Sequence, residues 1–170
     1  MFEVEKKEHY QKKDWPFFPI LFSLIIGFGW CVIDLISTKE VFDFNIWKIL
    51  GIILLSIGGV IEFWIRIILV NKANFSNHFS TMLLKVNNDH QLVTWGPFKH
   101  IRHPMYTGFI LQVIGIGLLS FSIYGSIFLM IGLAFYIPRI QIEENMLIKK
   151  FGNEYIEYQK KTKKFIPFIY

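Results

Sequence analysis

Long apolar blocks alternate with short polar segments along this chain. The first two blocks cover residues 16–36 and 46–70, and each is long enough to cross a bilayer, since a helix needs about 20 residues for this. A third block, residues 104–137, carries no charged residue and is too long for one ordinary crossing. Because Ser120 and Ser122 lie near its middle, it predicts two crossings joined by a tight turn, a transmembrane hairpin. Small residues are expected to allow close helix packing, in the second block at Gly51, Gly58 and Gly59, and between the arms of the hairpin at Gly108, Gly115, Gly117 and Gly132.

The polar segments complete the predicted organisation. Residues 1–15 are rich in lysine and predict an N-terminal tail, and residues 71–103 form the largest polar connection. Residues 138–162 have helical periodicity that Gly152 interrupts. We therefore predict an all-α, polytopic membrane protein with four transmembrane helices. Its predicted parts are the tail, two N-terminal transmembrane helices over residues 16–70, and a C-terminal part over residues 71–170.

Composition and charge support the membrane class and orient the chain. Hydrophobic residues make up 53% and charged residues 18%, below the roughly 25% charged residues of a soluble domain. The net charge of +5 does not indicate a nucleic-acid partner, because the lysines lie beside the apolar blocks as a topology signal. The basic segments are the N-terminal tail, the connection before the hairpin and the segment after it. This pattern predicts that both termini are cytoplasmic.

The segment from Gly96 to Gly108 contains most of the residues that could bind a ligand or take part in a reaction. It holds two prolines, two histidines and an arginine where the polar connection meets the hairpin. Pro104 suits the first turn of a helix, and His103 is disfavoured from helical conformation because it precedes proline. The N–H groups that follow would form a site for the carboxylate or phosphate of a small ligand. The alternative is a helix start with positively charged flanks.

Ionisable pairs lie at the ends of the predicted spans. Arg139 and Glu143 are four residues apart, which is also the spacing of an intrahelical salt bridge, and Glu144 is expected to be solvated on the next face. Glu62 and Arg66 share a helix face in the same way. Under the predicted topology these groups gather in the cytoplasmic leaflet, where ionisable side chains indicate a functional site.

The remaining histidines and aromatic residues predict no further site. His78, His90 and His100 do not have the spacing of metal ligands, so no metal site is predicted. Tyr155 and Tyr158 belong to a C-terminal aromatic stripe that is typical of core or membrane contact.

The last hundred residues contain several short motifs whose order along the chain is characteristic. They are residues 74–79, 90–94, 96–98, 102–108, 139–147, 151–155 and 166–167. In order and spacing they resemble the isoprenylcysteine carboxyl methyltransferase family of integral membrane enzymes. The resemblance implies that residues 71–170 are the catalytic core of a methyltransferase, with a cytoplasmic pocket for S-adenosylmethionine.

The resemblance also assigns roles to matched positions. Arg139 would hold the carboxylate of the acceptor, and Glu143 would close the cofactor pocket, so these two residues are the predicted catalytic pair. The other predicted cofactor contacts are His90, Gln91, Leu92, Val93, Phe98, His103, Pro104, Met105 and Tyr106. Members of the family often have tyrosine at the position of Phe98, which keeps the aromatic ring but lacks the hydroxyl.

The expected acceptor is lipophilic and reaches the site from the membrane lipids, and an isoprenylcysteine-like carboxylate is the main hypothesis. An N-methyltransferase acting on a phospholipid amine is an alternative, although an amine needs a base more than an arginine. NADPH-dependent sterol reductases carry a similar Arg-His-Pro-x-Tyr motif, but more spans precede their hairpin. A non-catalytic membrane scaffold is the third hypothesis.

Overall fold

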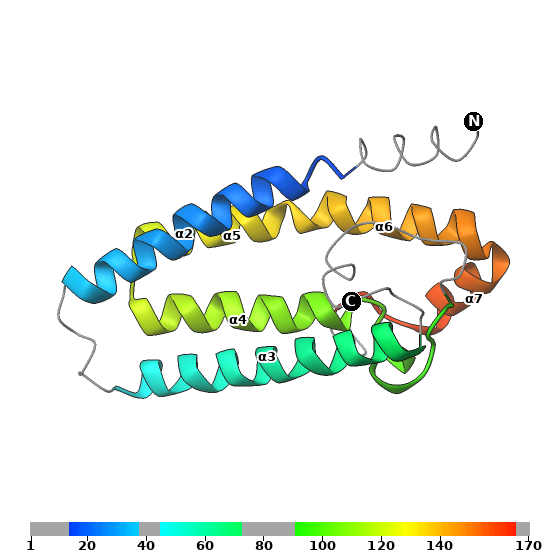
Figure 1. The fold of residues 1–170 in the computed structure, drawn as a ribbon, viewed down its shortest axis with the longest axis horizontal. Helices are drawn as coiled ribbons and strands as arrows, with labels where there is room; N and C mark the ends of the chain where they lie inside the picture. Colours follow the sequence, from blue (N-terminus) through cyan, green and yellow to red (C-terminus); the bar gives the residue numbers. More distant parts are fainter. Residues whose placement is uncertain (1–13, 38–44, 73–90, 166–170) are drawn as a thin grey trace. The chain divides into compact units, whose positions relative to one another are not determined.

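Helices make up nearly all of the structure. The computed structural model describes residues 14–37, 45–72 and 91–165. The elements in chain order are α2 (Phe17–Ser37), α3 (Ile46–Lys72), the short 3-10 helix η3 (Gly96–Lys99), α4 (Pro104–Ser120), α5 (Ile123–Ala134), α6 (Tyr136–Phe151) and α7 (Asn153–Lys161) (Figure 1). Within the described residues, β structure is limited to one parallel bridge between Ile101 and Lys163. The all-α prediction is confirmed.

Three helical stretches are long and apolar enough to cross a membrane. They are α2, Ile46–Asn71 of α3, and Ile123–Phe151, where α5 and α6 follow each other with only Phe135 between them. Helix α4 is also apolar, but its 17 residues span only about 26 Å at 1.5 Å per residue, against roughly 30 Å of hydrocarbon. The chain is an integral membrane protein, whereas four complete crossings remain a prediction.

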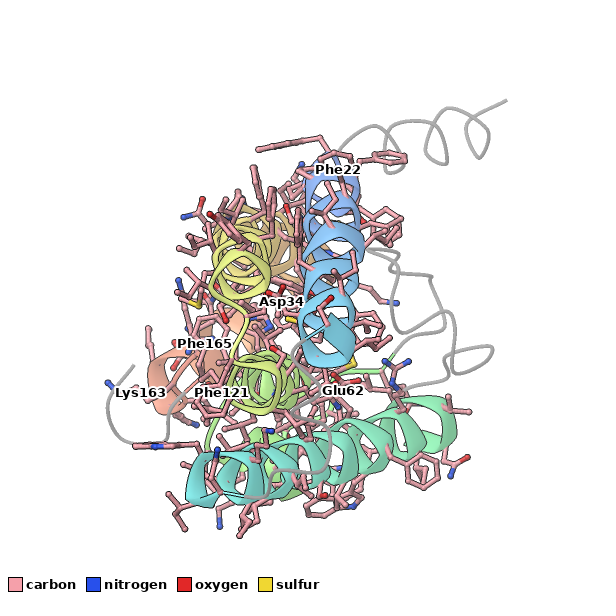
Figure 2. The ribbon with its side chains drawn as sticks, turned by 90° about the vertical axis from the view of Figure 1, so that its left-hand side faces the viewer. Phe22, Asp34, Glu62, Phe121, Lys163 and Phe165 are labelled. Carbon is pink, nitrogen blue, oxygen red and sulfur yellow. The ribbon has the colours of Figure 1, made fainter. Side chains whose placement is uncertain are left out.

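Large apolar side chains cover the outer surface of these helices. Phe18 and Phe22 on α2 are 72% and 65% exposed, and Val60 on α3 is 68% exposed. Phe22 projects outward from α2 (Figure 2). Extended apolar surface of this kind is unusual on a soluble monomer, and contact with lipid accounts for it.

The predicted hairpin turn lies at Phe121 and Ser122. Phe121 has a φ of +51°, which reverses the chain after α4. The Ser122 hydroxyl caps α5 by accepting a hydrogen bond from the N–H of Gly125 at 3.0 Å, and it donates to a carboxylate oxygen of Asp34 at the end of α2. The buried hydroxyl thus satisfies a helix end and holds the turn against α2.

The chain divides into two compact units. The apolar unit comprises residues 16–61 and 108–137, and its core contains Cys31 of α2, Val113 of α4 and Leu129 of α5. The polar unit comprises residues 1–15, 62–107 and 138–170. The units do not follow chain order, because α3 and α4 each contribute one end to the polar unit.

Glycines bring α3 and α4 together inside the apolar unit. A Cβ atom built on Gly115 would lie 2.7 Å from the carbonyl oxygen of Gly51, and one built on Gly58 would collide with the carbonyl of Gly108. Such small residues let two helix backbones approach, as is common in membranes. The predicted packing role of Gly51 and Gly58 is confirmed.

Most glycines of the hairpin, however, do not lie between its two arms. Gly108, Gly115, Gly117 and Gly132 were all expected between its two arms, and only Gly117 faces the other arm, at Ser126. Gly108 and Gly115 face α3, and Gly132 faces Ser23 of α2. That expectation was wrong for three of these glycines because α4 packs on α3 and α5 packs on α2.

Replacing Gly115 by alanine tests this packing. We expect Gly115→Ala to lower the stability by about 1–3 kcal/mol, because the added methyl group meets the backbone of α3. The matched control is Gly29→Ala, since a Cβ on Gly29 would meet nothing within 4 Å. Thermal unfolding in detergent micelles measures both, and equal midpoints for the two variants would contradict the proposed contact.

Candidate active site

The segment before α4 is held by the C-terminal residues of the polar unit. Gly96 begins η3 with a φ of +61°, a conformation that favours glycine. The backbone N–H groups of Arg102 and His103 donate to the carbonyls of residues 163 and 164, at 2.7 and 3.0 Å. Because His103 precedes proline it lies outside the helix, and α4 begins at Pro104 as predicted.

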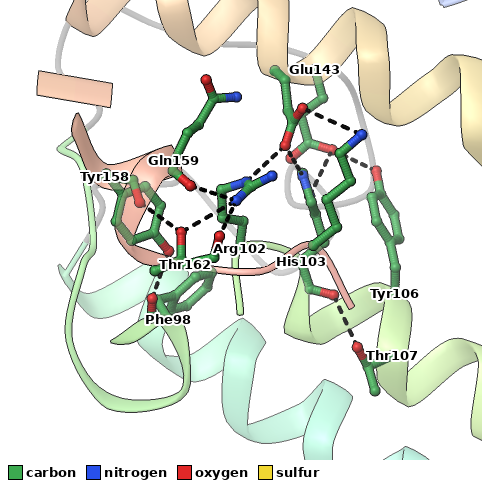
Figure 3. A network of polar contacts seen from close by, with 11 residues as sticks. Phe98, Arg102, His103, Tyr106, Thr107, Glu143, Tyr158, Gln159 and Thr162 are labelled. Atoms are coloured by element: carbon green, nitrogen blue, oxygen red, sulfur yellow. Dashed lines mark hydrogen bonds and ion pairs between the residues drawn. The ribbon is translucent and has the colours of Figure 1, made fainter. Parts of the chain in front are cut away.

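Arg102 is the centre of a polar network (Figure 3). Its Nε donates to Oε1 of Glu144 at 2.9 Å, and its Nη1 donates to the carbonyls of Gln159, at 3.1 Å, and of Thr162. The side chain is only 9% exposed, so these acceptors replace water around the guanidinium. Arg102 thereby joins the start of α4 to α6 and to the end of α7.

Glu144 is a buried partner in this network, which corrects the expectation of a solvated side chain. Its Oε1 lies 2.9 Å from Nε of Arg102 and 3.3 Å from Nε2 of His103, and its Oε2 lies 3.9 Å from Nζ of Lys164. The residue is 9% exposed. Helical spacing alone placed Glu144 beside the face of Glu143. It did not show that two other segments contribute basic side chains there, Arg102 and His103 from one and Lys164 from the other.

His103, Tyr106 and Glu143 meet next to this network. The hydroxyl of Tyr106 donates to Oε2 of Glu143 at 2.7 Å, and Nδ1 of His103 lies 3.8 Å from the same oxygen. The rings of His103 and Tyr106 stack with centroids 5.5 Å apart, and the ring of Phe165 lies 6.2 Å from that of His103. Three residues predicted to contact a cofactor therefore lie together, although His103 and Tyr106 at the start of α4 are distant in sequence from Glu143 on α6.

The two adjacent carboxylates differ in how fully they are engaged. Both oxygens of Glu144 face basic groups, and its side chain is 11% exposed. In the described part of the chain, the polar contacts of Glu143 involve Oε2, and its side chain is 29% exposed. Glu144 is therefore suited to holding the structure, whereas Glu143 has an oxygen that can accept a hydrogen bond from a ligand.

Arg139 and Glu143 take separate partners rather than forming the intrahelical pair that their spacing allows. Nη2 of Arg139 lies 3.3 Å from Oδ2 of Asp14, which precedes α2, and the two side chains are 6% and 14% exposed. Glu62 and Arg66 do form their expected pair, at 3.0 Å. A guanidinium that already holds a carboxylate in a nearly buried site has the chemistry of a carboxylate receptor.

Both tyrosines of α7 are buried, and Tyr158 is a hydrogen-bond donor. The hydroxyl of Tyr158 donates to the carbonyl of Phe98 at 2.7 Å, which fixes η3 against α7. Burial raises the pKa of Tyr158, so the phenol remains a donor. Burial, and then the carboxylates of Glu144 and Glu143, raise the pKa of Tyr155 as well. The stripe is core, as its periodicity indicated.

The other predicted cofactor residues precede α4, lie in its first turn, or fall outside the described residues. Val93, Phe98 and Pro104 are buried, Leu92 and Met105 are half-buried, and Gln91 is exposed. His90 lies outside the described residues. The role of all these residues in binding a cofactor remains a prediction.

Sequence reasoning missed three contributors, Arg102 as a structural tie, Glu144 as its partner and Asp14 as the partner of Arg139. Arg102 and Glu144 both belong to the recognised motifs, so their burial could have been suspected from their position there. Asp14 lies in a lysine-rich segment without a motif, and nothing in its sequence context distinguishes it.

Comparison with known proteins places these motifs in a family context. The phospholipid methyltransferase family matches residues 46–154. The protein-S-isoprenylcysteine O-methyltransferase of Schizosaccharomyces pombe is 37% identical over 86 residues, covering 50% of this chain and 36% of that protein. Its counterpart in Saccharomyces cerevisiae is 37% identical over 123 residues, covering 71% and 49%. The chain thus spans less than half of the length of either relative.

A solved structure agrees with the sequence matches. The eukaryotic intramembrane Ras methyltransferase, an isoprenylcysteine carboxyl methyltransferase, superposes with a TM-score of 0.67 at 27% identity. The match covers 88% of this chain and 52% of that chain. The resemblance inferred from the motifs is confirmed.

Removing the guanidinium at position 102 tests the structural network. We expect Arg102→Ala to lower the stability by about 3–5 kcal/mol, because it leaves the carboxylate of Glu144 without its main buried partner. The control is Lys160→Ala, which breaks an exposed pair with Glu157 and is expected to leave the unfolding midpoint unchanged. Thermal unfolding in detergent measures both, and a wild-type midpoint for Arg102→Ala would show that the network does not stabilise the fold.

Proposed function

This chain belongs to the phospholipid methyltransferase family, and we propose that it transfers a methyl group from S-adenosylmethionine to the carboxylate of a lipophilic, isoprenylcysteine-like acceptor. Its relatives with that named activity support the acceptor class. The observation that carries the proposal is the 2.7 Å hydrogen bond between Tyr106 and Glu143, because the motifs assign both residues to the methyl-donor site.

The residues around this contact fit the charge and shape of S-adenosylmethionine. The stacked rings of His103 and Tyr106 offer aromatic faces, which attract a sulfonium cation. Glu143 is partly exposed and can accept from the donor's ammonium or hydroxyl groups. Phe98, which is buried, would add an apolar wall. These residues, together with Gln91, Leu92, Val93, Pro104 and Met105, form the proposed donor site, to which the motifs add His90.

When bound, S-adenosylmethionine would supply the methyl group. The methyl carbon would bond to an acceptor oxygen as its bond to sulfur breaks, which would leave a methyl ester and a neutral thioether. The acceptor carboxylate is ionised at neutral pH, so the chain does not need a strong general base. Arg139 would orient that carboxylate through its guanidinium, which can bind two oxygens at once. The residues then contribute by alignment and by excluding water.

The proposed location of the reaction follows from the membrane spans. A lipophilic acceptor would enter from the bilayer, and the water-soluble donor would enter from the cytoplasm. This requires the start of α4 and the adjoining part of α6 to lie on the cytoplasmic side, with both termini cytoplasmic, as the positive-inside pattern predicts.

An N-methyltransferase acting on a phospholipid amine is the second candidate, and the family match favours it. An amine must lose a proton before or during transfer, and Glu143 is the partly exposed carboxylate of this site. Arg139 argues for the carboxylate acceptor, because a buried guanidinium repels an ammonium group and binds an anion.

A transfer assay separates these functions. We expect labelled methyl groups from S-adenosylmethionine to appear on a farnesylated N-acetylcysteine and not on phosphatidylethanolamine in the same vesicles. S-adenosylhomocysteine should raise the thermal unfolding midpoint, and NADPH should not. Label in the phospholipid would favour the second candidate, and stabilisation by NADPH alone would favour the reductase hypothesis.

Substitutions at Arg139 and Glu143 test the assigned roles. We expect Arg139→Ala to lower kcat/KM for the prenylated acceptor by about 100-fold or more while donor binding stays near wild type, because alignment of the acceptor is lost. Glu143→Ala should weaken donor binding by roughly tenfold or more. Calorimetric titration with S-adenosylhomocysteine measures donor binding.

A matched control for Arg139 is Arg66→Gln, which removes a guanidinium from another ion pair of the polar unit. We expect it to leave acceptor turnover close to wild type. Normal methylation by both Arg139→Ala and Glu143→Ala would refute the site assignment.

A further inference from the structure

Arg139 holds a carboxylate that the chain itself provides. Oδ2 of Asp14 lies 3.3 Å from Nη2 of Arg139, with both residues in the polar unit. Arg139 is 5% exposed, and the Asp14 side chain is 14% exposed. Asp14 precedes the first spanning helix, and 125 residues separate it from its partner along the chain. The pair therefore links the N-terminal segment to the helix that carries Glu143.

Two different carboxylates are assigned to the guanidinium of Arg139. The proposed function assigns it to the acceptor, whereas the structure pairs it with Asp14. We propose that Asp14 stands in for the acceptor carboxylate on Arg139 and is exchanged for it when the acceptor binds. This inference rests on the proposed function, because it needs Arg139 to be the acceptor-binding group.

Exchange between two carboxylates keeps a nearly buried charge compensated. An arginine at this exposure would be costly without an anion, and Asp14 supplies one while no acceptor is present. An incoming carboxylate replaces Asp14 with the same charge, and a guanidinium can bind both of its oxygens. A neutral ester, including the methylated product, offers no negative charge, so Asp14 can return as the product forms.

The stand-in carboxylate also sets selectivity for the acceptor. A prenyl chain that ends in an amine or an amide cannot compensate the guanidinium, so it does not displace Asp14. For a carboxylate, the apparent affinity equals the intrinsic affinity multiplied by the fraction of protein in which Asp14 is already displaced. Asp14 is thus a specificity-determining residue, which acts through Arg139 rather than on the transferred methyl group.

Asp14→Asn tests the exchange, because asparagine keeps the size of the side chain and removes its charge. We expect KM for farnesylated N-acetylcysteine to fall by about three- to tenfold, with kcat unchanged within roughly twofold. The equilibrium dissociation constant of the same probe, measured without methyl donor, should fall by the same factor. The KM for S-adenosylmethionine should stay at the wild-type value.

Two further variants separate charge from structure. Glu62→Gln removes a carboxylate of similar exposure, 15%, from the Arg66 pair in the same unit, and should leave both acceptor constants unchanged. Asp14→Glu retains the charge and should remain within about twofold of wild type. Stabilisation by S-adenosylhomocysteine verifies that each variant is folded before the acceptor constants are compared.

The outcomes distinguish this inference from the proposed function. An unchanged or raised KM in folded Asp14→Asn would show that Asp14 only orients Arg139 or anchors the N-terminal segment, and would overturn the exchange. Loss of the stabilisation by S-adenosylhomocysteine in Asp14→Asn, with Asp14→Glu intact, would also overturn it in favour of a structural charge. Absence of methyl transfer to any carboxylate by the wild-type chain would instead refute the proposed function.

Discussion

The burial of one guanidinium, that of Arg102, governs the arrangement of the polar unit. A nearly buried arginine must find acceptors for its N–H groups, and these come from Glu144 of α6, from Gln159 at the end of α7 and from Thr162 beyond it. The acceptors lie 42 to 60 residues further along the chain, so satisfying this one side chain brings three segments together. His103 and Tyr106, which lie one and four residues after Arg102, are thereby brought next to α6. The geometry of the candidate site is a consequence of this satisfied charge.

Two adjacent glutamates have different surroundings, which suit one to a structural role and the other to ligand binding. Glu144 gives both oxygens to Arg102, His103 and Lys164 and leaves little surface to solvent. Glu143 is turned toward Tyr106 and keeps more of its side chain exposed. A helix can present neighbouring residues about 100° apart, so a single Glu-Glu pair can face a structural network on one side and a ligand on the other. The same pair in reversed orientation would bury the carboxylate proposed to bind the methyl donor and expose the structural one.

Much of the fold was predictable because lipid imposes length and apolarity on each helix. The hydrophobic blocks located α2 and α3, and the serines around Ser122 located the hairpin turn. Boundaries were less predictable: the polar helix begins at Tyr136 rather than Pro138, since proline is tolerated in a first helical turn. Within the site, the motif resemblance assigned His103, Tyr106 and Glu143, which the structure brings together. The burial of Glu144 and the pairing of Asp14 with Arg139 depend on contacts between distant segments, which periodicity and spacing do not encode.

The parallel bridge between Ile101 and Lys163 has a consequence for biosynthesis. A ribosome makes Arg102 and His103 long before it makes residues 159–165, which supply the backbone partners of both. The apolar helices can therefore be inserted into the membrane while the arginine still awaits its acceptors. A translation product interrupted within α7 would carry its apolar helices and both glutamates, but it would lack the segment that closes the network. The site can therefore assemble only after residues 159–165 have been synthesised.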